Sequence, residues 1–456
     1  GGLYYWAAKL APESGRNGAK WSWFVGWFNL VGQVAVTAGI DFGFAFFFNA
    51  FLDVLTNGAF AATPPNTILI FGAVLIVHAL LNTFGIRVVK ILNDVSVWWH
   101  LAGVGVIFLV TVVLNQHTRT DLGTVFSTFV DNTNGCAANT PCGWPGPLAF
   151  GIPLYVILIG LLNAQYTLTG QDASAHMSEE THNASEAAPR GIIWSVIISV
   201  IAGFILLVSM NVGITPDKVF PDANGVANQV SGYAHALNSP LGVPPAQIWI
   251  DAVGQTGGLF VLFLVCGAQF YCGMSSVTAN SRMIYAFARD GAVPGSSFWH
   301  RINKRTRTPT NSIWLAAVGA FLLGLPYLWS PVAYAAVTSI AVIGLYVAYI
   351  TPVTLRLLAG DKFVRGPWHL GRWSRPVGII ATIWLVFIFI LFMLPQALPI
   401  NLSTFNYTPL VFLVVLGGAA LWYAVSAKNW FKGPKVQGSA EELRAIEQDL
   451  ELSFEG

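Results

Sequence analysis

The sequence predicts an all-α polytopic membrane protein with ten membrane-spanning helices. Three observations lead to this fold class. Of the 456 residues, 55% are hydrophobic and only 10% are charged, whereas ordinary soluble domains have roughly 25% charged residues. Ten apolar runs are long enough for the helix of about 20 residues that crosses a bilayer core. The basic residues lie almost entirely in the loops on one side of these runs.

The apolar runs are separated by charged segments or by segments rich in Pro and Gly. Because lipid cannot satisfy backbone hydrogen bonds, helices are the default for such runs, and the alternation typical of a transmembrane barrel is missing. In chain order the predicted spans cover residues 24–55, 67–84, 95–114, 149–178, 191–213, 252–284, 311–329, 332–357, 376–396 and 408–427.

The positions of Lys and Arg indicate the orientation of the chain. With a cytoplasmic amino terminus, all 23 Lys and Arg residues except Arg119 and Lys218 lie on the cytoplasmic side. Positive residues accumulate on that side of membrane proteins. The sequence therefore predicts cytoplasmic amino and carboxyl termini, with residues 1–23 as a cytoplasmic loop and residues 115–148 as an extracellular loop.

Two cysteines, Cys136 and Cys142, lie in the predicted extracellular loop. A disulfide between them is one interpretation, since an oxidising compartment favours such pairs, and two unpaired loop cysteines are the other. Beyond the last span, residues 429–456 become charged, and Ser439 to Glu442 has capping-box spacing before apolar residues at helical intervals. A short amphipathic helix is expected in this cytoplasmic tail.

Ionisable residues inside a span are costly and are functional candidates for that reason. The sequence has four: Asp41, His78, His100 and Asp172. Asp41 is expected either to hydrogen-bond to a neighbouring helix or to handle a proton or the substrate. His78 is expected to pack in the core. His100 follows two tryptophans, which is typical of a residue at the headgroup level.

The fourth span ends in the polar stretch YTLTGQDASAH, residues 166–176. Thr167, Thr169 and Gly170 have short side chains or a permissive backbone, which allows the helix to break. A broken helix is tolerated where its freed backbone groups face protein or a water-filled cavity, and its ends then attract a polar substrate. The spacing fits a simple helix end equally well, so both interpretations stand at this point.

The sequence argues against several other classes of protein. A net charge of +2 gives no support for a nucleic-acid partner. The phosphate-binding motif of ATPases, the nucleophile elbow and the zinc-protease motif do not occur, so an enzyme is not expected. His176, Glu179, Glu180 and His182 match no zinc spacing. We therefore expect neither a metal site nor a cofactor.

Four strings of the sequence occur together in one known family. They are residues 1–12 with 27–43, residues 169–192, residues 281–296 and residues 339–357. In this order they resemble the amino acid/polyamine/organocation permeases, and within them the amino acid/choline transporter branch that includes fungal GABA and choline permeases.

This resemblance implies a LeuT-like fold of two inverted five-helix repeats plus two extra helices. The family's first two helices precede the string at residues 1–12, so the chain is expected to be truncated, with ten spans of twelve. The resemblance then divides the chain into the rest of the first repeat (24–114), the second repeat (149–357), two additional spans (358–428) and the tail.

The resemblance also implies roles for individual residues. Asp172 matches an acidic gating position, and His100 lies near a lysine that replaces a sodium ion in some members. Together with Asp41, these are the candidate gating and coupling residues. The candidate substrate-binding residues are Gln33, Tyr166, Thr167, Thr169, Gly170 and Gln171.

The expected function is a secondary active transporter. It would import an amino acid or a related small amine such as GABA across the plasma membrane, with protons as the coupling ion and the lipid bilayer as its surroundings. Two alternatives remain from the sequence: a choline, ethanolamine or polyamine carrier of the same fold, and a membrane sensor that does not transport.

Overall fold

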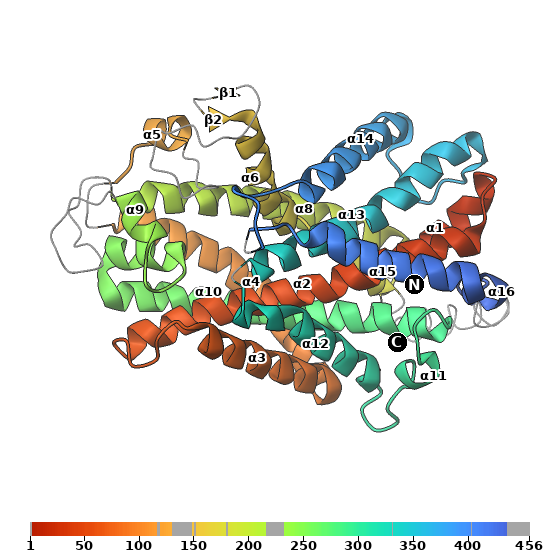
Figure 1. Ribbon diagram of the computed structural model, residues 1–456, viewed down its shortest axis with the longest axis horizontal. Helices are drawn as coiled ribbons and strands as arrows, with labels where there is room; N and C mark the ends of the chain where they lie inside the picture. Colours follow the sequence, from red (N-terminus) through yellow and green to blue (C-terminus); the bar gives the residue numbers. More distant parts are fainter. Residues whose placement is uncertain are drawn as a thin grey trace, which may run out of the picture.

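The computed structural model describes residues 2–115, 119–129, 148–149, 152–178, 181–215, 232–330, 332–402 and 404–435. Apart from two paired two-residue strands, β1 (Leu148–Ala149) and β2 (Ile152–Pro153), its regular structure is helical (Figure 1). The α-helices are α1 (Gly2–Glu13), α2 (Gly18–Leu55), α3 (Pro64–Phe84), α4 (Ile86–Phe108), α5 (Leu122–Ser127), α6 (Leu154–Thr167), α7 (Ala173–His176), α8 (Ala184–Gly213), α9 (Gly232–Leu237), α10 (Pro244–Arg289), α11 (Ser296–Trp299), α12 (Thr310–Gly324), α13 (Ala333–Ala359), α14 (Ser374–Met393), α15 (Thr408–Trp422) and α16 (Lys428–Trp430).

Within these described residues, nine helical segments are long and apolar enough to cross a membrane. They correspond to nine of the ten predicted spans. The remaining predicted span, residues 149–178, is not one continuous helix: α6 ends at Thr167, and α7 begins only at Ala173. The 14 residues of α6 extend about 21 Å, which is less than the bilayer core of about 30 Å.

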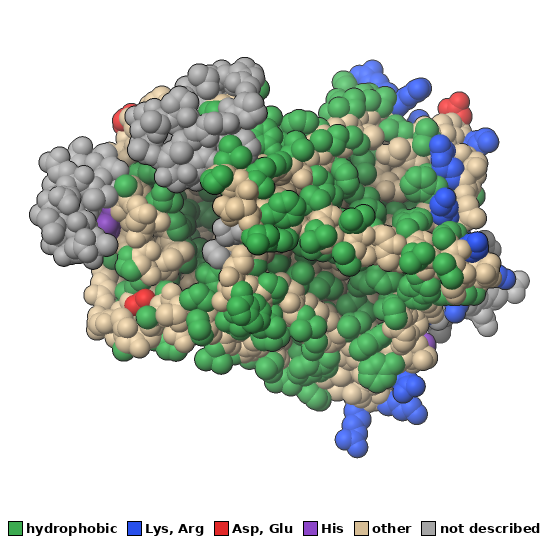
Figure 2. Space-filling model, viewed as in Figure 1, with side chains coloured by type: hydrophobic (Ala, Val, Ile, Leu, Met, Phe, Trp, Pro, Cys, Tyr) green, Lys and Arg blue, Asp and Glu red, His purple; other side chains and the backbone are tan. Residues whose placement is uncertain are grey.

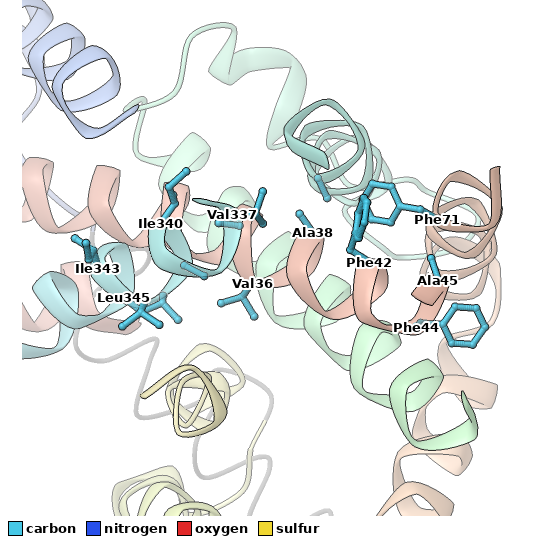
Figure 3. Packing of buried hydrophobic residues seen from close by; sticks show 14 of the residues in the cluster. Val36, Ala38, Phe42, Phe44, Ala45, Phe71, Val337, Ile340, Ile343 and Leu345 are labelled. Atoms are coloured by element: carbon cyan, nitrogen blue, oxygen red, sulfur yellow. The ribbon is translucent and has the colours of Figure 1, made fainter. Parts of the chain in front are cut away.

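Helix α2 forms the centre of the bundle, and α8 lies at its edge. In the most apolar part of α2, 67% of the residues are buried, whereas none are buried in the corresponding part of α8. The apolar residues of α2 pack against α3 and α13 (Figure 3). Phe42 and Phe71, for example, have ring centroids 4.9 Å apart. A strongly apolar helix with little of its surface buried, like α8, is suited to lipid on its outer face.

Residues 1–23 were expected to be a loop, but they contain α1. Its buried residues Leu3, Tyr4, Ala7 and Ala11 recur at helical intervals and pack in a cluster with Trp23 and Phe287. This recurrence is why the segment is helical, because one face of it can be buried. The cluster also includes Phe431 from the segment after α16.

A buried carboxylate joins three parts of the chain at this end. Asp290, which follows α10, accepts a hydrogen bond from the Tyr4 hydroxyl at 2.6 Å and from the Lys435 backbone N–H at 3.1 Å. The Asp290 carboxylate therefore links α1, the end of α10 and the last described residues.

The surface separates into an apolar belt and a basic end. Figure 2 shows hydrophobic side chains over most of the visible face, and Lys and Arg side chains gathered at the end where α11 and α16 lie in Figure 1. This distribution of charge is the one expected of a protein whose middle faces lipid.

Candidate functional site

The break between α6 and α7 leaves backbone groups free of helical hydrogen bonds. Gly170 has φ of +88°, a left-handed conformation that glycine adopts without steric cost. Two threonine hydroxyls turn back to the end of α6: Thr167 donates to the Asn163 carbonyl at 2.9 Å, and Thr169 donates to the Tyr166 carbonyl at 2.6 Å. The stretch therefore contains both a helix end and a new helix, which the sequence alone left undecided.

A small cavity opens at this break. It has a volume of about 140 Å³ and is bounded on one side by the break and on the other by α8. Most of its polar lining comes from hydroxyl, amide and backbone groups. The lining residues are Thr167, Leu168, Thr169, Gly170, Gln171, Ser195, Val196 and Ser199. The arrangement can receive a small polar molecule between uncharged hydrogen-bonding groups.

Asp172 lies just behind this cavity and is 2% exposed. Its Oδ2 accepts a hydrogen bond from Gln33 Nε2 of α2 at 3.0 Å and lies 3.0 Å from His176 Nε2. Its Oδ1 accepts a hydrogen bond from the Tyr349 hydroxyl of α13 at 2.7 Å. The same hydroxyl accepts the Gly170 N–H at 3.1 Å. One carboxylate thus ties the break to two other helices.

Tyr166 lies at the end of α6 and points at α2. A Cβ atom on Gly39 would lie 2.3 Å from the Tyr166 hydroxyl oxygen, so the glycine leaves room for this group. The hydroxyl is buried and has no hydrogen-bond partner among the described residues. Its neighbour Gln165 is held firmly, since its side-chain oxygen accepts a hydrogen bond from the Tyr346 hydroxyl at 2.6 Å.

Asp41 forms a second acidic centre with a histidine. Asp41 Oδ1 of α2 lies 3.0 Å from His78 Nδ1 of α3, and both side chains are fully buried. His78, which the sequence suggested was a packing residue, is therefore the direct partner of Asp41.

The structure does not bring His100 to either centre. Its side chain is exposed on α4, and its Nδ1 contacts the Ser96 carbonyl of its own helix at 2.7 Å. Cys136, Cys142 and the helix expected after Ser439 lie outside the described residues.

Sequence reasoning missed two residues of the Asp172 centre. Tyr349 lies in an apolar run, where a tyrosine is ordinary, and only the packing of α13 against the break shows its role. His176 was considered only as a metal ligand. Its position four residues after Asp172 was a usable signal, because residues at this spacing meet on one face of a helical turn.

Comparison with known families decides the class of this chain. The sequence profile described as amino acid permease matches residues 1–416. The chain belongs to the amino acid permease family. It is therefore a transporter and not an enzyme, and its apolar helices are those of a multi-pass membrane protein. The predicted family and the all-α polytopic fold are confirmed.

Individual relatives of this permease agree with that assignment. It is similar to amino-acid permease BAT1 of Arabidopsis thaliana, with 39% identity over 445 residues that cover 95% of this chain and 80% of the relative. A BAT1 homolog of Oryza sativa subsp. japonica is 40% identical over 449 residues, with the same coverage. The GABA-specific permease of Saccharomyces cerevisiae is 29% identical over 445 residues, covering 97% of this chain and 73% of the relative.

Proposed function

We propose that this permease imports an amino acid or a small amine related to GABA across the plasma membrane and that protons drive the transport. The observation that carries this proposal is the break between α6 and α7, with its cavity of about 140 Å³. The named relatives support the substrate class, since they include amino-acid permeases and a GABA-specific permease.

In this proposal the substrate binds at the break. Thr167, Thr169, Gly170 and Gln171 contribute to the cavity directly. The two helix ends at a break complement a zwitterion, because the partial positive charge at a helix start favours the carboxylate and the partial negative charge at a helix end favours the ammonium group. Gln33 and Tyr166 belong to the site but do not line the cavity. Gln33 holds Asp172 by a hydrogen bond, and Tyr166 packs against Gly39 of α2.

Asp172 serves as the gate. Its carboxylate is hydrogen-bonded to Gln33 and Tyr349, which come from the two helices that flank the break. Separation of these helices must break charge-assisted hydrogen bonds, so their presence or absence distinguishes two conformations of the bundle.

The basic end of the bundle supports cytoplasmic termini (Figure 2). We assign residues 24–114 to the first repeat, 149–357 to the second repeat, and 358–428 to the additional spans.

Transport by the full-length protein in liposomes tests the proposal. Labelled GABA and neutral amino acids are supplied outside, with unlabelled choline as a competitor. We expect uptake that collapses when a protonophore dissipates the proton gradient and that is unchanged when potassium replaces sodium. Competition by choline but not by amino acids would overturn the substrate class, and a strict requirement for sodium would overturn proton coupling.

A further inference from the structure

The Asp41 and His78 side chains form an ionisable pair with few other contacts. Both are 0% exposed. Apart from their mutual approach at 3.0 Å, neither carboxylate oxygen of Asp41 and neither ring nitrogen of His78 has a hydrogen-bond partner in the described part of the chain. Buried polar atoms are normally satisfied, and those that are not usually serve a purpose other than stability.

Asp172 and Asp41 differ in the number of their hydrogen-bond donors. Asp172 has hydrogen-bond donors on both of its oxygens and lies beside His176. Asp41 has only the His78 ring at 3.0 Å. A fully hydrogen-bonded carboxylate links helices through bonds that must break when the helices separate. A carboxylate whose one partner can gain or lose a proton near neutral pH has a charge that depends on that proton.

Helix α10 closes the remaining side of the pair. A Cβ atom on Gly273 would lie 1.9 Å from Asp41 Oδ1 and 2.7 Å from His78 Cε1, so only a glycine fits there. The Phe270 ring lies against the His78 ring with centroids 4.6 Å apart. Since both side chains are 0% exposed, bulk water does not reach the pair in this conformation.

Few other titratable groups face the pair. Cys272 of α10 and Tyr166 of α6 lie within electrostatic reach of Asp41, and Tyr334 of α13 lies within reach of Tyr166. Helix α12, which also packs against α2 and α3, has no titratable side chain. Since thiols and phenols are neutral near pH 7, a proton that binds near Asp41 resides on Asp41 or His78.

We propose that the Asp41–His78 pair is the proton-carrying site of this permease, an inference that rests on the proton coupling proposed above. With one proton, the pair is an aspartate beside an imidazolium and has no net charge. Loss of that proton to water would leave a buried, uncompensated aspartate, which is costly inside protein. The proton is therefore retained until the site opens.

Tyr166 connects this site to the substrate. Its hydroxyl lies against Gly39 of α2, two residues before Asp41, and its backbone carbonyl accepts the Thr169 hydroxyl at the break. A rearrangement of the break moves Tyr166 and with it the packing around α2. We infer that substrate release and exposure of the protonated pair occur together, with the proton leaving the imidazolium for water on the cytoplasmic side.

Two modes of transport, exchange and accumulation, distinguish a failure of the Asp41–His78 assignment from a failure of proton coupling, on which the assignment rests. Exchange of internal for external substrate needs no net proton movement, whereas accumulation driven by a proton gradient does. In liposomes, we expect Asp41→Asn and His78→Gln to retain exchange within about 3-fold of wild type and to lose gradient-driven accumulation and the accompanying internal acidification by at least 10-fold. The two variants guard against a folding failure in either one, checked by size-exclusion chromatography.

The matched control is another pair of the same two residue types. His235 Nδ1 lies 2.9 Å from Asp251 Oδ2, but these side chains are 23% and 11% exposed. His235→Gln should leave accumulation unchanged. Proton-driven accumulation that persists in Asp41→Asn or His78→Gln overturns the assignment of the pair. If neither exchange nor accumulation by the wild-type protein depends on the proton gradient, proton coupling itself is overturned.

Discussion

Removal of the Tyr349 hydroxyl tests whether the Asp172 centre gates transport. In Tyr349→Phe, Asp172 loses a hydrogen bond of 2.7 Å and the Gly170 N–H loses its acceptor at 3.1 Å. A hydrogen bond to a charged group contributes about 1.5–3 kcal/mol and a neutral one about 0.5–1.5 kcal/mol. The conformation described here should therefore lose about 2–4.5 kcal/mol relative to one in which these helices are apart.

Water that enters the loosened site offsets part of this loss. At about 1.4 kcal/mol for each factor of ten, we expect the uptake rate of Tyr349→Phe to fall by about 10-fold or more. The affinity for substrate should change by less than about 3-fold, because Tyr349 does not line the cavity. Initial uptake rates in liposomes and equilibrium binding in detergent measure the two quantities.

Tyr346→Phe is the matched control. Tyr346 lies one turn earlier on α13, and its hydroxyl also donates to a buried acceptor, Gln165 Oε1, at 2.6 Å. This variant removes the same atom from the same helix and should lower thermal stability without a comparable loss of uptake rate. Equal uptake by Tyr349→Phe and wild type, or equal losses in both variants, would refute the gating role of Asp172.

Two further substitutions test the gate and the core. Asp172→Asn should slow transport more than it weakens substrate binding, and uptake at the wild-type rate would remove Asp172 from the mechanism. Gly32→Ala places a Cβ 2.7 Å from the Leu345 backbone nitrogen, so overpacking should cost about 1–3 kcal/mol and lower the melting temperature in detergent. Gly103→Ala, where a Cβ would meet nothing within 4 Å, should leave the melting temperature unchanged. Equal melting temperatures of Gly32→Ala and Gly103→Ala would show that α2 and α13 can move apart at this contact without cost.

The sequence predicts the spans well because hydropathy depends on composition alone. Helix α8 is the clearest case, since its most apolar stretch has the highest hydropathy of the nine candidate spans in the described residues. Boundaries are predicted less well. Helix α10 begins at Pro244, earlier than the predicted residue 252, but its backbone is kinked at Gly254, where φ is +75°, so the predicted start lies two residues before the kink. Helix α1 was missed although its apolar residues already had helical spacing.

The candidate site was predictable only in part. The polar stretch around Gly170 showed where a break could occur, but the choice between a break and a helix end depends on what packs against it. Tyr349 and Gln33 come from helices far away in the chain, and no local pattern indicates that they meet at Asp172. The partnership of Asp41 with His78 is hidden for the same reason: the sequence marks each as an ionisable residue within a span, but nothing in it indicates that the two side chains meet.

The exposed position of α8 has a consequence for how substrate preference can diverge. Ser195 and Ser199 form one wall of the cavity, yet the helix that carries them buries none of its most apolar stretch. Substitutions at weakly packed positions usually change stability by less than about 0.5 kcal/mol. Mutations in this wall can therefore reshape the cavity without compensating changes in the core. Under the substrate site proposed above, substrate preference could change through these two positions while α2 and its neighbours stay constant.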